Sequence, residues 1–75
     1  MIDEFIREFE ACLEILPGTI KAETALADIE KLYSMGRLSV MAMADSKFGV
    51  VLDADTLDAS VTVSDLFSHV NRAQP

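Results

Sequence analysis

Near the start of the chain, hydrophobic residues recur at steps of three and four positions, and charged side chains fill the positions between them. The hydrophobic residues are Ile2, Phe5, Ile6, Phe9, Leu13 and Leu16. This spacing places them on one face of a helix, so we expect an amphipathic helix over residues 2–16. Pro17 and Gly18 should end it, because proline cannot continue the hydrogen-bond ladder and glycine tolerates a left-handed exit.

Between residues 19 and 32 the pattern becomes irregular, with single apolar residues among polar ones. These apolar residues are Ile20, Leu26, Ile29 and Leu32. We expect a long loop here, with a helical turn near residues 25–30. Long loops in small domains are usually functional or disordered, and the scattered hydrophobic residues predict that this one is pinned onto the core.

The next periodic segment begins at Ser34, whose hydroxyl is suited to cap the first turn of a helix. The apolar stripe that follows consists of Met35, Leu38, Met41 and Ala42. This stripe predicts a helix over residues 34–46, which Phe48 and Gly49 should close.

The segment between residues 50 and 63 allows two interpretations. Residues 50–52 and 61–63 are rich in valine and could form two short paired strands. Against this, residues 53–59 contain aspartates suited to cap a helix, which favours a short helix over residues 54–59 between the two runs.

The last helix has the clearest start signal in the chain. Thr62 is followed three residues later by Asp65, which resembles a capping box with aspartate in the usual place of glutamate or glutamine. Val63, Leu66 and Val70 then share one helical face, so we expect a helix over residues 63–71. The chain should therefore be all-α: one domain over residues 1–75, a small bundle of three main helices and one short helix.

Charge and length narrow the classes of function. The chain has 75 residues, with 13 acidic and 6 basic side chains, for a net charge of −7. Nucleic acids and anionic membrane surfaces should be repelled, whereas a protein with basic patches should be attracted. The single cysteine, Cys12, cannot form an internal disulfide, and no apolar run approaches a membrane span, so we expect a cytoplasmic protein. A net charge of −7 on so small a chain favours a monomer.

The sequence contains no recognisable catalytic or metal-binding motif. Cys12 and the single histidine, His69, lie far apart and have no ligand partners nearby, and Asp53, Asp55 and Asp58 lack the glycine and final glutamate of a calcium loop. We expect neither a metal site nor an enzyme, and Cys12 should behave as a small core residue.

Ser34 is the residue most suited to carry chemistry, because the pattern places it where a loop passes into a helix. A phosphoester at that position would meet the free amides of the first turn and the positive end of the helix dipole. The alternative is an ordinary N-cap serine.

The segment around Ser34 resembles the central region of acyl carrier proteins. Residues 32–43 read Leu-Tyr-Ser-Met-Gly-Arg-Leu-Ser-Val-Met-Ala-Met, and residues 45–52 read Asp-Ser-Lys-Phe-Gly-Val-Val-Leu. In that family an aspartate-serine-leucine motif opens the second helix, which runs into an acidic stretch and a phenylalanine-glycine pair. Leu57 and residues 62–66 are similar to the family's short third helix and the start of its fourth.

This resemblance implies a carrier that catalyses nothing itself. Ser34 would receive a 4′-phosphopantetheine arm from coenzyme A, and acyl groups would be held as thioesters on the arm's terminal thiol. The implied partners are a phosphopantetheinyl transferase and acyl-handling enzymes, in a specialised lipid or secondary-metabolite pathway such as fatty acid or polyketide synthesis. We expect the partner surface to include Tyr33, Met35, Arg37, Leu38 and Asp45.

The chain departs from the family pattern next to Ser34. Tyr33 replaces the family's aspartate, Gly36 and Ser39 stand at positions that are usually acidic, and Arg37 adds positive charge. Fewer acidic residues should weaken the encounter with basic partners. Two interpretations follow: a specialised carrier with dedicated enzymes, or an unmodified carrier-like module that binds other proteins.

Overall fold

The computed structural model describes residues 2–74 and contains four α-helices and two short helical segments of other types. The α-helices are α1 (Ile2–Cys12), α2 (Arg37–Phe48), α3 (Ala54–Ala59) and α4 (Val63–Ala73). A 3₁₀ turn, η1 (Leu26–Asp28), lies in the long loop, and a π-helical segment, η2 (Leu32–Gly36), leads directly into α2. Three longer helices and one short helix confirm the predicted all-α bundle.

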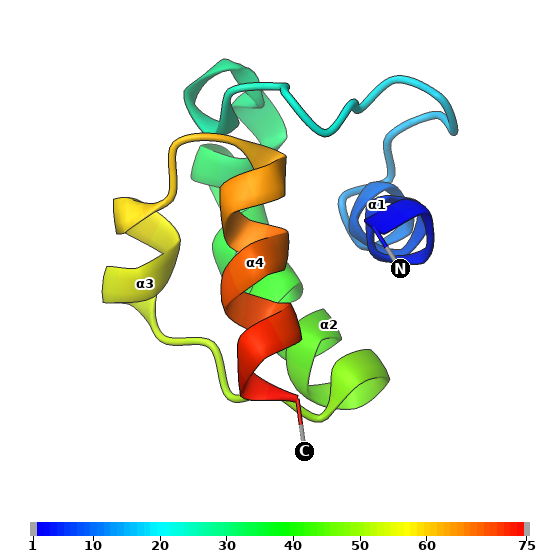
Figure 1. Cartoon of the computed structure of the whole chain (residues 1–75). Coiled ribbons are helices and arrows are strands. Elements are labelled where there is room, and N and C mark those ends of the chain that lie inside the picture. Colours follow the sequence, from blue (N-terminus) through cyan, green and yellow to red (C-terminus); the bar gives the residue numbers. More distant parts are fainter. Residues whose placement is uncertain (1, 75) are drawn as a thin grey trace.

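The helices surround a single core. α4 lies in front of α2 in Figure 1, α3 flanks α4 on one side, and α1 stands on the other side and is seen nearly end-on. The long loop after α1 crosses above them, and α1 contacts both α2 and α4.

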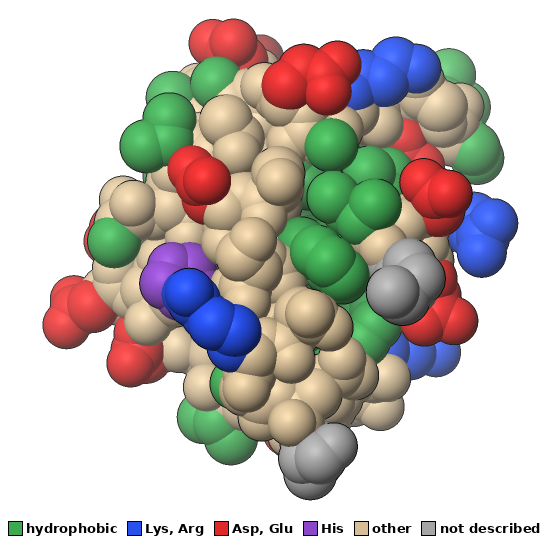
Figure 2. Space-filling model, in the orientation of Figure 1, with side chains coloured by type: hydrophobic (Ala, Val, Ile, Leu, Met, Phe, Trp, Pro, Cys, Tyr) green, Lys and Arg blue, Asp and Glu red, His purple; other side chains and the backbone are tan. Residues whose placement is uncertain are grey.

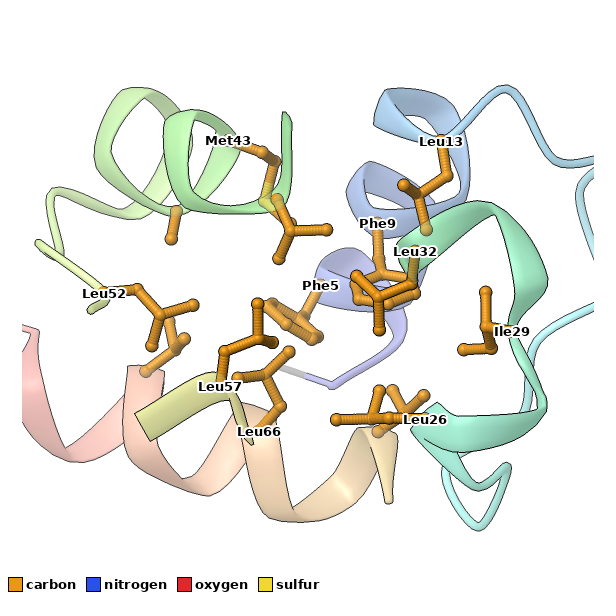
Figure 3. Packing of buried hydrophobic residues seen from close by; sticks show 14 of the residues in the cluster. Phe5, Phe9, Leu13, Leu26, Ile29, Leu32, Met43, Leu52, Leu57 and Leu66 are labelled. Atoms are coloured by element: carbon orange, nitrogen blue, oxygen red, sulfur yellow. The ribbon is translucent and has the colours of Figure 1, made fainter. Parts of the chain in front are cut away.

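Phe5 of α1 lies near the centre of the core, with Leu57 and Leu66 on one side and Phe9 and Leu32 on the other (Figure 3). Its ring centroid lies 5.9 Å from that of Phe9 and 5.6 Å from the rings of both Phe48 and Phe67. Such tilted aromatic pairs are worth about 0.5–1.5 kcal/mol each beyond the area that they bury. The buried hydrophobic residues are Phe5, Phe9, Leu13, Ile20, Leu26, Ile29, Leu32, Val40, Met43, Ala44, Val50, Leu52, Leu57, Val63, Leu66 and Val70.

Some apolar surface stays outside this core. Figure 2 shows hydrophobic side chains gathered on the face between α4 and α1, with acidic and basic side chains around them. A chain of this size buries only about 60% of the surface that its unfolded form exposes, so exposed apolar patches are expected.

The predicted end of the first helix is wrong by four residues, because α1 ends at Cys12 and not at Leu16. The Glu14 N–H donates to the carbonyl of Ala11 at 3.2 Å, and the Ile15 N–H donates to the carbonyl of Glu10 at 2.9 Å. This pair of bonds is a Schellman motif, and Glu14 occupies its left-handed position with φ of 58°. Pro17 and Gly18 lie beyond this turn and do not end the helix.

The loop after α1 is pinned onto the core, as predicted, and η1 is the expected helical turn. Ile20, Leu26 and Ile29 are buried. The Ile20 N–H donates to the carboxylate of Glu10 at 2.9 Å, and Glu10 is itself buried. The loop is therefore held to the core near its start by Ile20 and near its end by Leu26 and Ile29.

The same loop is tied to the start of α4 by main-chain hydrogen bonds. The Leu26 N–H donates to Val61 at 2.8 Å, the Val63 N–H donates to Thr24 at 3.0 Å, and the Ser64 N–H donates to Ala22 at 2.8 Å. Within residues 2–74, β-pairing is limited to one isolated antiparallel bridge, between Ala25 and Thr62. The proposed pairing of residues 50–52 with 61–63 as strands therefore does not form.

The second half of the chain follows the predicted elements closely. α2 runs to Phe48, two residues past the expected end at Ser46, and Gly49 follows it with φ of 68°. α3 has the expected bounds, and the Asp53 carboxylate accepts the Thr56 N–H at 2.7 Å. α4 starts at the expected residue and extends to Ala73, two residues past the expected end.

The capping box at α4 forms in both directions. The Asp65 N–H donates to the hydroxyl oxygen of Thr62 at 3.1 Å, and the Asp65 carboxylate accepts the N–H of Thr62 at 3.1 Å. It also accepts the N–H of Val61 at 3.1 Å. Since these bonds favour the ionised form, they lower the pKa of Asp65 below its ordinary value of 3.8, with the Thr62 amide the largest cause.

Replacing Glu14 with glycine should stabilise the protein by about 1 kcal/mol, because a residue with a Cβ is disfavoured in the left-handed region. Urea unfolding monitored by circular dichroism measures the change. Glu14→Ala is the matched control: it removes the same side chain and keeps the Cβ, so it should bring no such gain. Equal stabilities for the glycine and alanine variants would contradict the explanation.

Lowering the pH should weaken the cap that Asp65 forms at the start of α4. The pKa of Asp65 is lower in the folded chain than in the unfolded chain, so the contribution of the cap is complete above the ordinary pKa of 3.8 and is lost as the pH falls through the lower, folded pKa. In urea unfolding between pH 7 and pH 2, the free energy of unfolding should fall less for Asp65→Asn than for the parent chain. An identical loss for Asp65→Asn would contradict this role, and Asp45→Asn, which is remote from the cap, is the control.

Candidate functional site

Ser34 lies inside a helix and not at its start, so its predicted N-cap role is wrong. Helical backbone begins at Glu30 and continues without a break through η2 and α2 to Phe48. The Ser34 hydroxyl donates to the carbonyl of Lys31 at 3.3 Å, one turn back. The free amides of the first turn therefore belong to residues before Ser34 and do not surround its oxygen.

The helix begins early because its buried face begins early. Ile29, Leu32 and Val40 are buried, and their spacing continues one apolar stripe across Ser34. Glu30 adds a negative charge at the positive end of the helix dipole, which favours a start at that point. The expected helix over residues 34–46 is thus the later part of a longer one.

The Ser34 side chain is exposed, and its oxygen is not enclosed by packed residues. It lies within η2, where the π-helical backbone locally widens the helix. Such segments are uncommon and occur frequently at functional sites. The hydroxyl is therefore accessible for esterification, although without the helix-end setting that the sequence predicted.

Gly36 fixes the Ser34 helix against the end of α1. Gly36 is buried, and a Cβ at this position would collide with the Leu13 side chain and lie 2.6 Å from the carbonyl oxygen of Lys31. Lys31 adds a second link, because its ammonium group donates to the carbonyl of Glu14 at 2.9 Å. Two contacts, one apolar and one polar, hold the Ser34 helix in place against the end of α1.

Three large apolar side chains are exposed around Ser34. Tyr33 is 47% exposed, Met35 is 87% exposed and Leu38 is 77% exposed. Together with Ser34 and Arg37 they line a shallow hollow of about 170 Å³ on one side of the helix. The structure thus brings together four of the five predicted partner residues.

Asp45, the fifth predicted partner residue, is exposed but lies about three turns further along α2. Arg37 is partly covered, and its guanidinium pairs with Asp58 of α3 at 2.8 Å. Its Nε is buried without a hydrogen-bond partner among the described residues. The positive charge of Arg37 is therefore compensated within the chain.

Two further hollows lie between α1 and the helix that carries Ser34. The first, of about 390 Å³, is lined by residues that include Lys31, Ser34 and Ser39. The second, of about 500 Å³, lies further along α2 and is lined by residues that include Ala42, Ser46 and Lys47. Cys12 and Ser39 line both hollows, which makes them parts of one groove, named here the α1–α2 groove.

Cys12 is half-buried and packs against the core, as expected of a small apolar residue. Burial and, to a smaller extent, the nearby charge of Glu8 raise its thiol pKa to about 11. The thiol is therefore almost entirely protonated at neutral pH, which makes Cys12 a poor nucleophile.

Sequence reasoning missed three residues that shape this site: Lys31, Gly36 and Asp58. Lys31 and Arg37 stand three residues before and after Ser34, which is a helical spacing visible in the sequence once the helix is known to begin at Glu30. The roles of Gly36 and Asp58 depend on contacts with Leu13 and Arg37 that are distant in sequence.

Gly36→Ala should destabilise the protein by about 1–3 kcal/mol, because the added methyl group collides with Leu13 and with backbone. Helix propensity alone predicts the opposite sign, since alanine favours helix by about 1 kcal/mol over glycine. The change in the free energy of urea unfolding shows which of these two effects is larger. Ser39→Ala, on the exposed side of α2, should change stability little. A Gly36→Ala chain as stable as the parent would disprove the close contact.

Within residues 2–74, no three His, Cys, Asp or Glu side chains gather as metal ligands do, and no helix has both the length and the apolar character needed to cross a membrane. In comparisons with known proteins, no family model, curated protein or solved structure matches the chain. A functional assignment therefore rests on the residues around Ser34 and on the order of the helices.

Proposed function

We propose that the chain is an acyl carrier protein whose Ser34 carries a 4′-phosphopantetheine arm. The observation that supports this most is the exposed Ser34 hydroxyl, set among exposed apolar side chains on the helix that follows the long loop. The order of helices also agrees with the resemblance: a first helix, a long loop, a second helix, a short third helix and a fourth.

The residues around Ser34 fit the arm. The hydroxyl makes one long hydrogen bond, at 3.3 Å, which it can give up at little cost. Open hollows adjoin it on two sides, so a substituent on its oxygen has room. Lys31 stands one turn away and offers a positive charge to a phosphodiester. In the transfer, the serine oxygen forms the new bond to phosphorus, its proton leaves, and coenzyme A releases adenosine 3′,5′-bisphosphate.

The arm, once bound, supplies a flexible tether whose thiol holds an acyl group as a thioester. The chain's own residues position that tether and present it to other enzymes. Tyr33, Met35 and Leu38 offer apolar surface for transient contacts, and the net charge of −7 attracts partners with basic patches. Tethering gives each enzyme a high local concentration of acyl group without tight binding. The cargo we propose is an acyl intermediate of a specialised lipid or secondary-metabolite pathway.

A second candidate is an unmodified module that binds other proteins through the same surface. Two observations favour it: Ser34 lies inside the helix with its hydroxyl bonded to Lys31, and Tyr33 stands where the family has an aspartate. The exposed Met35 and Leu38 would serve such a module equally well.

Intact mass after coexpression with a broad-specificity phosphopantetheinyl transferase separates the two candidates. We expect the parent chain to gain the mass of one phosphopantetheine and Ser34→Ala to gain none. Ser39→Ala, a matched serine one and a half turns further along, should be modified like the parent. Tyr33→Asp, which restores the family's carboxylate, should be modified at least as fast as the parent. If both the parent and Tyr33→Asp keep the bare polypeptide mass, the carrier function is wrong and the interaction module is favoured.

A further inference from the structure

Two sides of the Ser34 helix are open to a substituent on its oxygen, and they differ in character. On one side lies the shallow hollow of about 170 Å³, where the Arg37 charge is already paired with Asp58. On the other side lies the α1–α2 groove, whose two parts have volumes of about 390 and 500 Å³. The groove offers more room, and it leads away from Ser34 along the helix.

The lining of the α1–α2 groove combines charged, hydroxyl-bearing and apolar residues. The charged residues are Glu8, Glu14, Lys31 and Lys47. Lys31 lies at the end next to Ser34, and its ammonium group is exposed apart from the bond to the Glu14 carbonyl. Ser39 and Ser46, both exposed, line the groove further along α2. The apolar residues of the lining are Ala11, Leu13, Met35, Ala42 and Met43.

A phosphopantetheine arm has chemical groups that several of these residues can bind. It begins with an anionic phosphodiester, continues with a branched apolar carbon and a hydroxyl, and then has two amides separated by short methylene chains. Lys31 complements the phosphodiester, the serine hydroxyls can bond to amides, and the methionine side chains adapt to the methylene chains.

We propose that the arm carried by Ser34 binds in the α1–α2 groove, with its phosphodiester at Lys31 and its thiol end in the part of the groove lined by Ser39. The proposal rests on the proposed carrier function and adds where the arm lies on this chain. Ser39 lies five helical positions after Ser34, a rise of about 7.5 Å. The arm's main chain has about fourteen bonds from the serine oxygen to the thiol, nearly as many as five extended residues and roughly 16 Å, so its thiol reaches Ser39 without full extension.

Disulfide trapping tests the position of the arm, with Cys12→Ser as the background to remove the native thiol. Ser39→Cys places a thiol in the groove, and Leu38→Cys places one at the neighbouring residue in the opposite hollow. Both positions are exposed and lie within reach of the arm. The modified chains are treated with diamide, which accepts the two electrons and two protons that the thiols lose as the disulfide forms. Alkylation and intact mass then give the rate.

Each rate is divided by the reactivity of the same cysteine toward iodoacetamide in the unmodified chain, which corrects for differences in exposure. A groove-bound arm should form the disulfide about tenfold faster at Ser39→Cys than at Leu38→Cys, because binding raises the local concentration of its thiol there. Equal corrected rates, or a faster reaction at Leu38→Cys, would overturn the proposal. Circular dichroism confirms that both variants fold like the parent.

Lys31→Gln tests the charged end of the groove. It keeps the polar contact to the Glu14 carbonyl within reach and removes the positive charge, so the preference for Ser39→Cys should fall severalfold. An unchanged preference would show that Lys31 does not bind the phosphodiester. A chain that never gains the arm would instead refute the carrier function itself, and intact mass before oxidation distinguishes that outcome from a misplaced arm.

Discussion

The close approach of Leu13 to Gly36 is the constraint that joins the end of α1 to the Ser34 helix. α1 contributes the phenylalanines at the centre of the core, and its end can approach the Ser34 helix closely only because Gly36 has no side chain. The same approach brings Lys31 within hydrogen-bond distance of the Glu14 carbonyl. Leu13 and Gly36 also both line the α1–α2 groove. The absence of a side chain on Gly36 thus connects the packing of the core with the surface on which the candidate site lies.

The charges next to Ser34 along its helix differ in sign from the net charge of the chain. The net charge is −7, yet the two charged residues one turn before and one turn after Ser34 are Lys31 and Arg37. Long-range attraction of basic partners depends on the total charge, whereas contacts at short range depend on the local groups. The pairing of Arg37 with Asp58 leaves Lys31 as the better placed cation beside Ser34.

The elements that the sequence predicted well are those whose limits are set by local side chains. The Asp53 cap and the reciprocal pair of Thr62 and Asp65 fix the starts of α3 and α4 through contacts three residues apart, which a pattern of residue types reveals.

The helix boundaries that the sequence did not predict depend on backbone geometry or on packing between distant segments. The left-handed residue that ends α1 is a glutamate, and no residue type signals it. The irregular spacing before residue 34 predicts a loop, whereas the distant core buries Ile29 and Leu32 on one helical face and the helix begins earlier. The sequence could predict that Ser34 and Tyr33 are exposed. It could not predict the groove beside Ser34, because the groove exists only once α1 packs against the Ser34 helix.

The main-chain bonds between residues 22–26 and residues 61–64 have a consequence for folding kinetics. They join segments separated by more than thirty positions, so they can form only after most of the chain has come together. Small helical bundles normally fold rapidly because their contacts are local, and each long-range closure adds an entropic barrier. The pinned loop should therefore be among the last parts of the molecule to become ordered, after the helices that flank it.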